Sequence, residues 1–224
     1  MENKIKFRAA FLFAISFLFL FSFGKAYGQL GIRMALNLPN WSVSSGDPDA
    51  FGPINPQSYT GYQIYLTLDP FDRGKHQGVE IGYTQRGFKA QNIAGVGDEA
   101  TFQLDYIDLA LPLKFKSGSN RSSLLLQFGP YMGYAVDGKL KTKFLGQKNT
   151  ESLDFADLEI KRFDWGGICG LGFWFPTGED GEAIALDFRY SYGFQNLNNG
   201  SDSKKTKVRN TALNFGVTYC FGRR

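Results

Sequence analysis

The chain contains few side chains that could carry out chemistry. His76 is the only histidine among the 224 residues, whereas histidine-based metal clusters and Ser–His triads depend on this residue type. The glycine run from Gly167 to Gly172 resembles a nucleotide-binding loop, but it does not open a helix. Asp47-Pro48-Asp49 is better explained as a solvated turn than as a cation site. The sequence therefore predicts no catalytic residue, no metal site and no cofactor.

Charged residues on alternating segments form a second set with chemical potential. From Ile184 to Phe194, bulky apolar residues at even positions alternate with small or charged residues, including Asp187 and Arg189. Strict alternation indicates a β-strand with one apolar and one polar face. An aromatic row opposite a charged face is typical of a transmembrane barrel strand, which has lipid outside and a polar lumen inside.

The same alternation recurs along the chain. It predicts eight strands, at residues 30–37, 61–68, 78–86, 106–115, 123–136, 164–175, 184–194 and 213–222. Long connections at 38–60, 88–101, 137–161 and 195–207 alternate with short ones. Barrels of the outer membrane have short periplasmic turns and longer external loops, so both termini are expected on the periplasmic side. Pro112 lies within the fourth strand and predicts a local break or bulge.

We therefore expect an all-β fold, an eight-stranded antiparallel transmembrane up-and-down β-barrel with a polar, largely filled lumen. A soluble barrel with an apolar interior is the alternative. An eight-stranded barrel has room only for side chains or one small ligand, and rows such as Leu171, Phe173 and Phe175 would overfill it. Glycines on the polar faces suit a narrow lumen, namely Gly82, Gly129, Gly133, Gly166, Gly170, Gly172 and Gly216.

The inward faces then carry four cations and four anions. They are Arg33, Glu80, Arg86, Asp108, Lys114, Asp164, Asp187 and Arg189. Buried charges persist when they are paired and hydrogen-bonded, so we expect a network that plugs the lumen together with Tyr65, Tyr106 and Tyr131. A polar conduit for small solutes is the alternative.

The N-terminal segment is a targeting signal in this interpretation. Lys4, Lys6 and Arg8 precede an apolar run from Ala9 to Phe23, which is shorter than the roughly 20 residues of a spanning helix. We expect a signal peptide at residues 1–28, cleaved before Gln29, and one barrel domain at residues 29–224. The leader contains four cationic residues and one glutamate, so the net charge falls from +4 to +1 after cleavage. Nucleic acid is not expected as a partner.

The two cysteines, Cys169 and Cys220, are expected on opposite strand faces. The phase assigned to the sixth strand places Cys169 outward, and that of the eighth places Cys220 inward. They are therefore expected to be unpaired rather than joined in a disulfide.

Several motifs resemble one family in the same order along the chain. They are Leu104 to Leu109, Gly129 to Tyr134, Asp164 to Gly172, Arg189 to Gly193 and Asn214 to Phe221. The sequence is similar to the PorT-type outer-membrane β-barrel proteins of Bacteroidetes over nearly all the mature chain. The family usually has its fourth-strand proline at the position of Ala110, whereas this chain has Pro112. The resemblance implies a porin-family barrel of the cell envelope, and some members are associated with type IX secretion.

Three functions follow as expectations. The first is a non-enzymatic structural or accessory barrel in the Gram-negative outer membrane, surrounded by lipid and lipopolysaccharide and engaging other envelope or secretion proteins. The second is a small-solute porin or channel. The third is a lipid-modifying enzyme, which the position of His76 in a periplasmic turn disfavours. Lys204, Lys205 and Lys207 could contact lipopolysaccharide phosphates, but a merely solvated loop explains them better.

Overall fold

The computed structural model describes residues 28–45, 56–70, 75–93, 97–118, 122–144, 147–155, 159–178, 182–200 and 206–222. Eleven strand segments lie in these ranges: β1 Gly28–Ser45, β2 Gly61–Pro70, β3 Lys75–Gln77, β4 Val79–Ile93, β5 Gly97–Ala110, β6 Leu113–Gly118, β7 Ser123–Phe144, β8 Gln147–Ser152, β9 Phe163–Pro176, β10 Ala183–Gly193 and β11 Thr206–Cys220. The expected signal peptide (its last residue, Gly28, apart) and Asp47-Pro48-Asp49 lie outside the described residues, as do Lys204 and Lys205.

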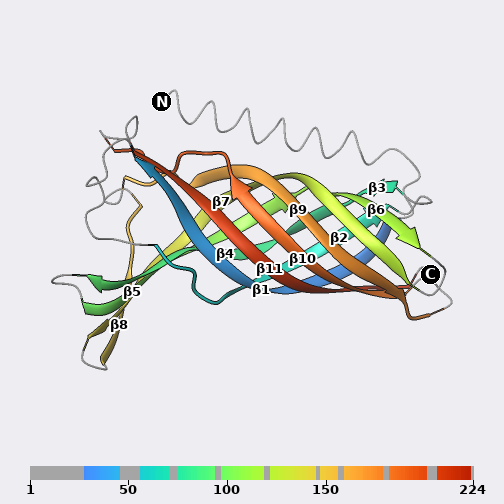
Figure 1. Ribbon diagram of the computed structural model, residues 1–224, viewed down its shortest axis with the longest axis horizontal. Coiled ribbons are helices and arrows are strands. Elements are labelled where there is room, and N and C mark those ends of the chain that lie inside the picture. The colour runs from blue at the N-terminus through green and yellow to red at the C-terminus, as the bar shows by residue number, and fades with distance from the viewer. Residues whose placement is uncertain are drawn as a thin grey trace.

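The strands of the described residues close into a ring of eight (Figure 1). Going round it, β1 pairs with β2, β2 with β4, β4 with β5, β5 with β7, β7 with β9, β9 with β10 and β10 with β11. The pairing of β11 with β1 completes the ring, and every pair is antiparallel. The all-β, eight-stranded up-and-down barrel expected from the sequence is thereby confirmed.

The remaining segments continue these strands or extend them. β3 directly precedes β4, and β6 directly follows β5. The pairing of β3 with β6 therefore continues the β4–β5 ladder beyond the pair Glu80–Ala110. The ladder is interrupted at Leu111 and Pro112, because proline has no N–H to donate. At the interruption, the Gly78 N–H donates to the Pro112 carbonyl at 2.7 Å, and the Leu111 N–H donates to the Pro130 carbonyl at 3.0 Å. The local break predicted at Pro112 is confirmed.

The two ends of the barrel differ in length of connection. β1 starts where β11 ends, with Gly31 paired to Cys220, and the connections 71–74, 119–122 and 177–182 lie at this turn end. The opposite end, the hairpin end, has the connections 46–60, 94–96, 145–146, 153–162 and 194–205, and the β4–β5 and β7–β8 hairpins extend from it (Figure 1). Counted from the ring, long excursions at the hairpin end alternate with short turns at the turn end, as the sequence predicts, although two of the four long excursions consist largely of strand.

Two segments expected as loops are largely strand, which is a correction. Residues 88–101 form a hairpin paired as far as Ile93 and Gly97, and β7 continues to Phe144 to pair with β8. The physical reason is a second alternation, in which Phe88 lies opposite Phe102 and Ala90 opposite Ala100. These apolar pairs give the hairpin a buried face, although lysine and glutamine between them make its composition look loop-like. His76 is likewise in the short strand β3 rather than in a turn.

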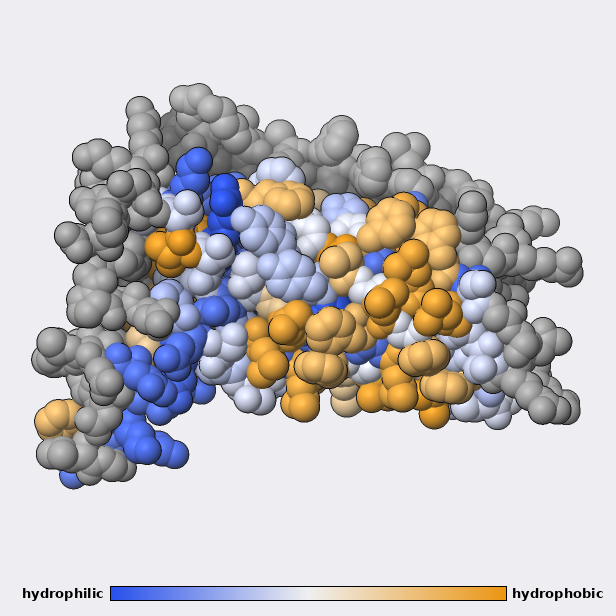
Figure 2. All heavy atoms as spheres, in the orientation of Figure 1, coloured by the Kyte–Doolittle hydropathy of each residue, from blue (hydrophilic) through white to orange (hydrophobic). Residues whose placement is uncertain are grey.

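The barrel has its apolar side chains outside and its polar side chains inside. Along β1, Met34 and Leu36 are 59% and 61% exposed, whereas Arg33 and Asn37 are fully buried. Figure 2 shows apolar side chains gathered over the middle of the barrel and hydrophilic ones towards the hairpin end. The exposed apolar band includes Ile64, Leu66, Ile81, Ile107, Leu126, Phe128, Leu171, Phe173, Leu186, Phe188, Phe215 and Val217. Among the described residues, no helix has the length and apolar character that would let it cross a membrane.

The two cysteines follow the strand phases assigned from the sequence. Cys169 on β9 is exposed and Cys220 on β11 is buried, and both are free thiols. Their expected placement on opposite faces is confirmed.

Candidate functional site

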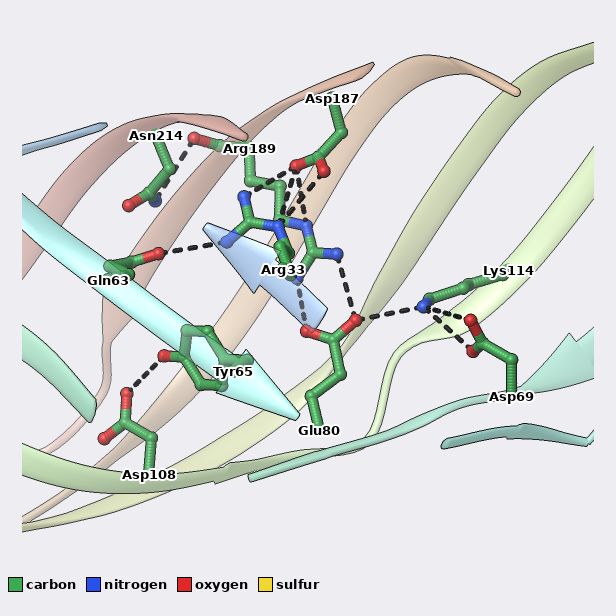
Figure 3. A network of polar contacts seen from close by, with 10 residues as sticks. All are labelled: Arg33, Gln63, Tyr65, Asp69, Glu80, Asp108, Lys114, Asp187, Arg189 and Asn214. Atoms are coloured by element: carbon green, nitrogen blue, oxygen red, sulfur yellow. Dashed lines mark hydrogen bonds and ion pairs between the residues drawn. The ribbon is translucent and has the colours of Figure 1, made fainter. Parts of the chain in front are cut away.

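The candidate site is the charged interior of the barrel, at the middle of the strands. Six side chains form one continuous series of ion pairs, in which cation and anion alternate (Figure 3). In order, they are Arg33, Asp187, Arg189, Glu80, Lys114 and Asp69. Three charges of each sign cancel, which is the condition under which buried ions persist.

Arginines bind the two carboxylates at the centre of this series. The Arg33 Nη2 atom lies 2.7 Å from Asp187 Oδ1, and Nε also donates to that carboxylate. Arg189 Nε lies 3.0 Å from the same Asp187 oxygen. Arg189 also donates through both terminal nitrogens to Glu80, at 2.5 and 3.0 Å. The planar guanidinium matches a carboxylate in this two-point manner, which fixes orientation as well as charge.

Lysine completes the series towards the turn end. The Lys114 Nζ atom lies 3.0 Å from Glu80 Oε1 and 2.9 Å from Asp69 Oδ1. All three side chains are almost fully buried. Glu80 therefore shares its carboxylate between Lys114 and Arg189 and connects the two halves of the series.

A second cluster lies nearer the hairpin end. The Arg86 guanidinium sits between two carboxylates, 2.6 Å from Asp108 and 3.3 Å from Asp164. Its Cζ atom also lies over the rings of Tyr106 and Tyr131, at 4.5 and 4.6 Å from their centres. A cation held between aromatic faces gains from the ring quadrupoles as well as from its carboxylate partners.

This cluster has two carboxylates and one guanidinium, and neutral side chains donate further hydrogen bonds to the carboxylates. The Tyr65 hydroxyl donates to Asp108 at 2.8 Å. Asp164 accepts from the Asn210 amide at 2.9 Å and from the Tyr131 hydroxyl at 3.2 Å. Two carboxylates facing one guanidinium are thus supported by three additional hydrogen bonds, which offset part of the desolvation of the ions.

Glycines on neighbouring strands provide the space for the arginines. A Cβ atom at Gly216 would lie 2.7 Å from Arg33 Cζ, and one at Gly133 would lie 2.8 Å from Arg86 Nη1. A Cβ atom at Gly170 would lie 2.9 Å from Arg189 Cγ. These distances are shorter than normal van der Waals contact, so each arginine side chain occupies room that only a glycine leaves open.

Apolar clusters lie beyond the charged region at both ends. At the hairpin end, the buried side chains of Trp41, Leu104, Tyr106, Ala135, Phe155 and Val208 pack together. At the turn end, a smaller cluster comprises Leu125, Trp174, Ala183, Ala185 and Cys220. The ions therefore lie between two apolar layers inside the same ring.

Little free space remains between the two charged clusters. A cavity of about 20 Å³ is lined by residues of both, among them Tyr65, Glu80, Arg86, Asp108 and Arg189. On this measure a single water molecule needs about 10–15 Å³. The cavity is large enough for about one water molecule and too small for a solute.

The structure places all eight charged residues singled out from the sequence inside the barrel. Five of them, Arg33, Glu80, Lys114, Asp187 and Arg189, belong to the alternating series, and Arg86, Asp108 and Asp164 form the second cluster. Tyr65, Tyr106 and Tyr131 are also buried there. Asp69 was missed, because sequence alternation ended the second strand at Leu68. Its inward phase, two residues after Thr67, was the available signal.

The comparison with protein families decides the identity of the fold. A family described as "Outer membrane protein beta-barrel domain" matches residues 26–199. The chain belongs to this family. It is an outer-membrane β-barrel protein, and the exposed apolar band is the surface that meets membrane lipid.

Several solved structures of outer-membrane proteins are similar to this barrel. Neisserial surface protein A shares 13% sequence identity with a TM-score of 0.43, over 86% of this chain and 97% of that chain. Ail of Yersinia pestis shares 17% identity with a TM-score of 0.39, over 87% of this chain and 99% of that chain. The outer membrane protein W of E. coli shares 15% identity with a TM-score of 0.36, over 88% and 100%.

Proposed function

We propose that this protein is a closed, non-enzymatic barrel that serves a structural or accessory role in the outer membrane. The observation that carries the proposal is the lumen, in which two ion clusters leave a cavity of only about 20 Å³. A solute would have to break ion pairs such as Glu80–Arg189 to pass. Removing one partner of a buried pair typically costs about 3–5 kcal/mol, which makes such passage unfavourable.

The orientation follows from the lengths of the connections. Outer-membrane barrels place short turns in the periplasm and long loops outside the cell. We therefore infer that the turn end is periplasmic, with the start of β1 and the end of β11 on that side, and that the β4–β5 and β7–β8 hairpins face the exterior. These hairpins are then the parts that the barrel presents beyond the membrane.

Planar-bilayer recording tests the closed lumen. The purified, refolded chain is expected to insert without producing a stable current. The comparison is a variant with both Glu80→Ala and Arg189→Ala, in which the lumen is less obstructed. This variant removes the ion pair that crosses the lumen and leaves neither of its two charges behind. A stable open current from the unmodified protein would overturn the proposal and favour the small-solute channel.

The resemblance to PorT-type barrels of Bacteroidetes supports an accessory role in the envelope, with protein secretion as its setting. Affinity isolation of the barrel from its own outer membrane tests this role. We expect specific recovery of envelope proteins by the full chain and reduced recovery by a variant with a shortened β7–β8 hairpin. Equal recovery by both would count against a role for the hairpin in partner binding.

The absence of enzymatic activity is also part of the proposal. A lipid hydrolase using histidine would need it near the outer interface, whereas His76 is on β3 at the turn end. Incubation of the reconstituted barrel with labelled lipopolysaccharide is expected to release no acyl chain. Release that persists after replacement of His76 would identify an activity built on other residues and would overturn this part of the proposal.

A further inference from the structure

The outer wall of the hairpin end carries a group of lysines on one face. Thr101 on β5 pairs with Lys89 on β4 and with Lys141 on β7, and Lys143 on β7 pairs with Lys148 on β8. Directly paired residues point to the same face of a sheet, as do residues two apart on one strand. The resulting lysine face comprises Lys89, Lys139, Lys141, Lys143 and Lys148.

Carboxylates neutralise two of these five lysines. Lys89 forms an ion pair with Glu99 at 2.8 Å. Lys139 forms ion pairs with Asp137 at 3.0 Å and with Asp105 at 3.4 Å. These pairs lie at the base of the face and along β4.

The other three lysines have no such partner in the described part of the chain. Lys141 donates to the neutral Gln103 amide oxygen at 2.8 Å. Lys143 lies between Glu99 on β5, whose carboxylate forms its ion pair with Lys89, and Lys148 on β8. Lys143 and Lys148 stand directly opposite each other, and both are exposed. Like charges in this position destabilise a hairpin. Glu151, the acidic residue of β8, lies on the other face, opposite Leu140.

The lysine face continues the band that meets lipid. On β5, Gln103 and Asp105 lie on the same face as the exposed Ile107, and on β7 the exposed Val136 lies just before Asp137. Lys139 to Lys143 follow Val136 by about 10–23 Å of strand length at 3.3 Å per residue. Figure 2 shows this hydrophilic region beside the apolar band. Strand tilt shortens the height, and lysine stems can lean towards the membrane.

We propose that the lysine face binds the phosphate groups of an anionic glycolipid in the leaflet around the hairpin end. With the orientation inferred above, this is the phosphorylated lipid of the outer leaflet. The phosphates supply the negative charge that Lys141, Lys143 and Lys148 lack, and each lysine near an anionic membrane surface adds to the attraction. The lipid thereby relieves the repulsion between Lys143 and Lys148.

Titration of the detergent-solubilised barrel with diphosphoryl lipid A, followed by native mass spectrometry, tests the proposal. Replacement of Lys141, Lys143 and Lys148 by Gln is expected to weaken lipid binding at least about tenfold, as three lost contacts near an anionic surface imply. Replacement of the same three by Arg is expected to retain binding. Heat-modifiable migration on gels shows that each variant is folded.

Lys161→Gln is the control. Lys161 is partly exposed in the connection between β8 and β9, outside the paired positions of β4, β5, β7 and β8 that form the lysine face. An equal loss in this control, or unchanged binding by the triple Gln variant, would overturn the proposal. Displacement of lipid A by inorganic phosphate at the same phosphorus concentration would overturn the assignment to a lipid. Binding in micelles depends neither on a closed lumen nor on orientation, so an open channel would leave this test unaffected.

Discussion

Arg189 on β10 reaches across the lumen to Glu80 on β4, four strands away around the ring, and holds it through two hydrogen bonds of 2.5 and 3.0 Å. This pair joins opposite walls of the barrel and is separated by 109 residues along the chain. It therefore holds β4 and β10 in place relative to each other, which hydrogen bonds between neighbouring strands cannot do directly.

Glu80→Ala is expected to destabilise the barrel strongly. It removes the carboxylate that Arg189 and Lys114 share and leaves two buried cations without their common partner. Loss of one member of a buried pair typically costs about 3–5 kcal/mol. Denaturant unfolding of the refolded protein in detergent measures the change.

Two comparisons isolate the role of the pair. Glu151→Ala, at an exposed position of β8, is expected to change the free energy of unfolding by less than about 0.5 kcal/mol. The double variant with Glu80→Ala and Arg189→Ala is expected to lose less stability than the sum of the single variants. Additive losses would show that the two side chains do not stabilise each other.

The sequence predicted the faces of the strands because the membrane demands a strict pattern. Lipid requires bulky apolar residues outside, and a narrow lumen requires small or charged residues inside. Phe188 with its neighbours Asp187 and Arg189 illustrates both requirements within three residues, and the structure places each of them on its expected side. A single strand of this kind indicates the fold before any tertiary contact is known.

The partners within the lumen could not be predicted in the same way. Alternation places Arg86 inside, but its contacts with Asp108 and Asp164 depend on strand stagger and barrel closure. The apolar cluster around Trp41 and Phe155 was missed for a related reason. Phe155 follows β8 in a charged segment, and its burial depends on the fold of the hairpin end rather than on local alternation.

Phe188→Lys is expected to impair assembly into the membrane. Phe188 is an outward residue of β10 whose ring centre lies 4.9 Å from that of Phe215 on β11. A lysine at the bilayer midplane on the lipid face costs roughly 2–4 kcal/mol. Membrane yield and heat-modifiable migration measure assembly. Asn149→Lys, on the exposed strand β8 and opposite Thr142, is the control and should assemble normally. Equal yields for the two variants would mean that the outward face does not meet lipid.

Gly82→Ala is expected to destabilise the wall between β2 and β4. A Cβ atom at this position would collide with the Ile64 carbonyl oxygen and lie 2.8 Å from Cδ1 of the Tyr65 ring. Backbone cannot move aside cheaply, and overpacking of this kind costs about 1–3 kcal/mol. Gly167→Ala on the outer wall is the matched control, because its Cβ would meet only the Phe194 ring at 3.3 Å and more distant atoms. A similar midpoint of denaturant unfolding for both variants would contradict this prediction.

Tyr59 is expected to stabilise the hairpin end at neutral pH and to lose this stabilising effect at alkaline pH. Burial, followed by the negative charge of Asp105, raises the pKa of Tyr59 well above its ordinary value. Its neutral hydroxyl donates to the Arg86 carbonyl at 3.1 Å. Because the folded pKa lies above the unfolded one, this contribution is complete below pH of about 10 and is lost as pH rises further.

Comparison with Tyr59→Phe measures this contribution. The unmodified protein should lose stability relative to the variant above pH of about 10, where the unfolded tyrosine ionises. Ultraviolet difference titration should count the same number of tyrosines ionising near the ordinary pKa in both folded proteins, because Tyr59 is not among them. If the unmodified protein has one more tyrosine ionising near the ordinary pKa than the variant has, Tyr59 is solvated and this prediction is wrong.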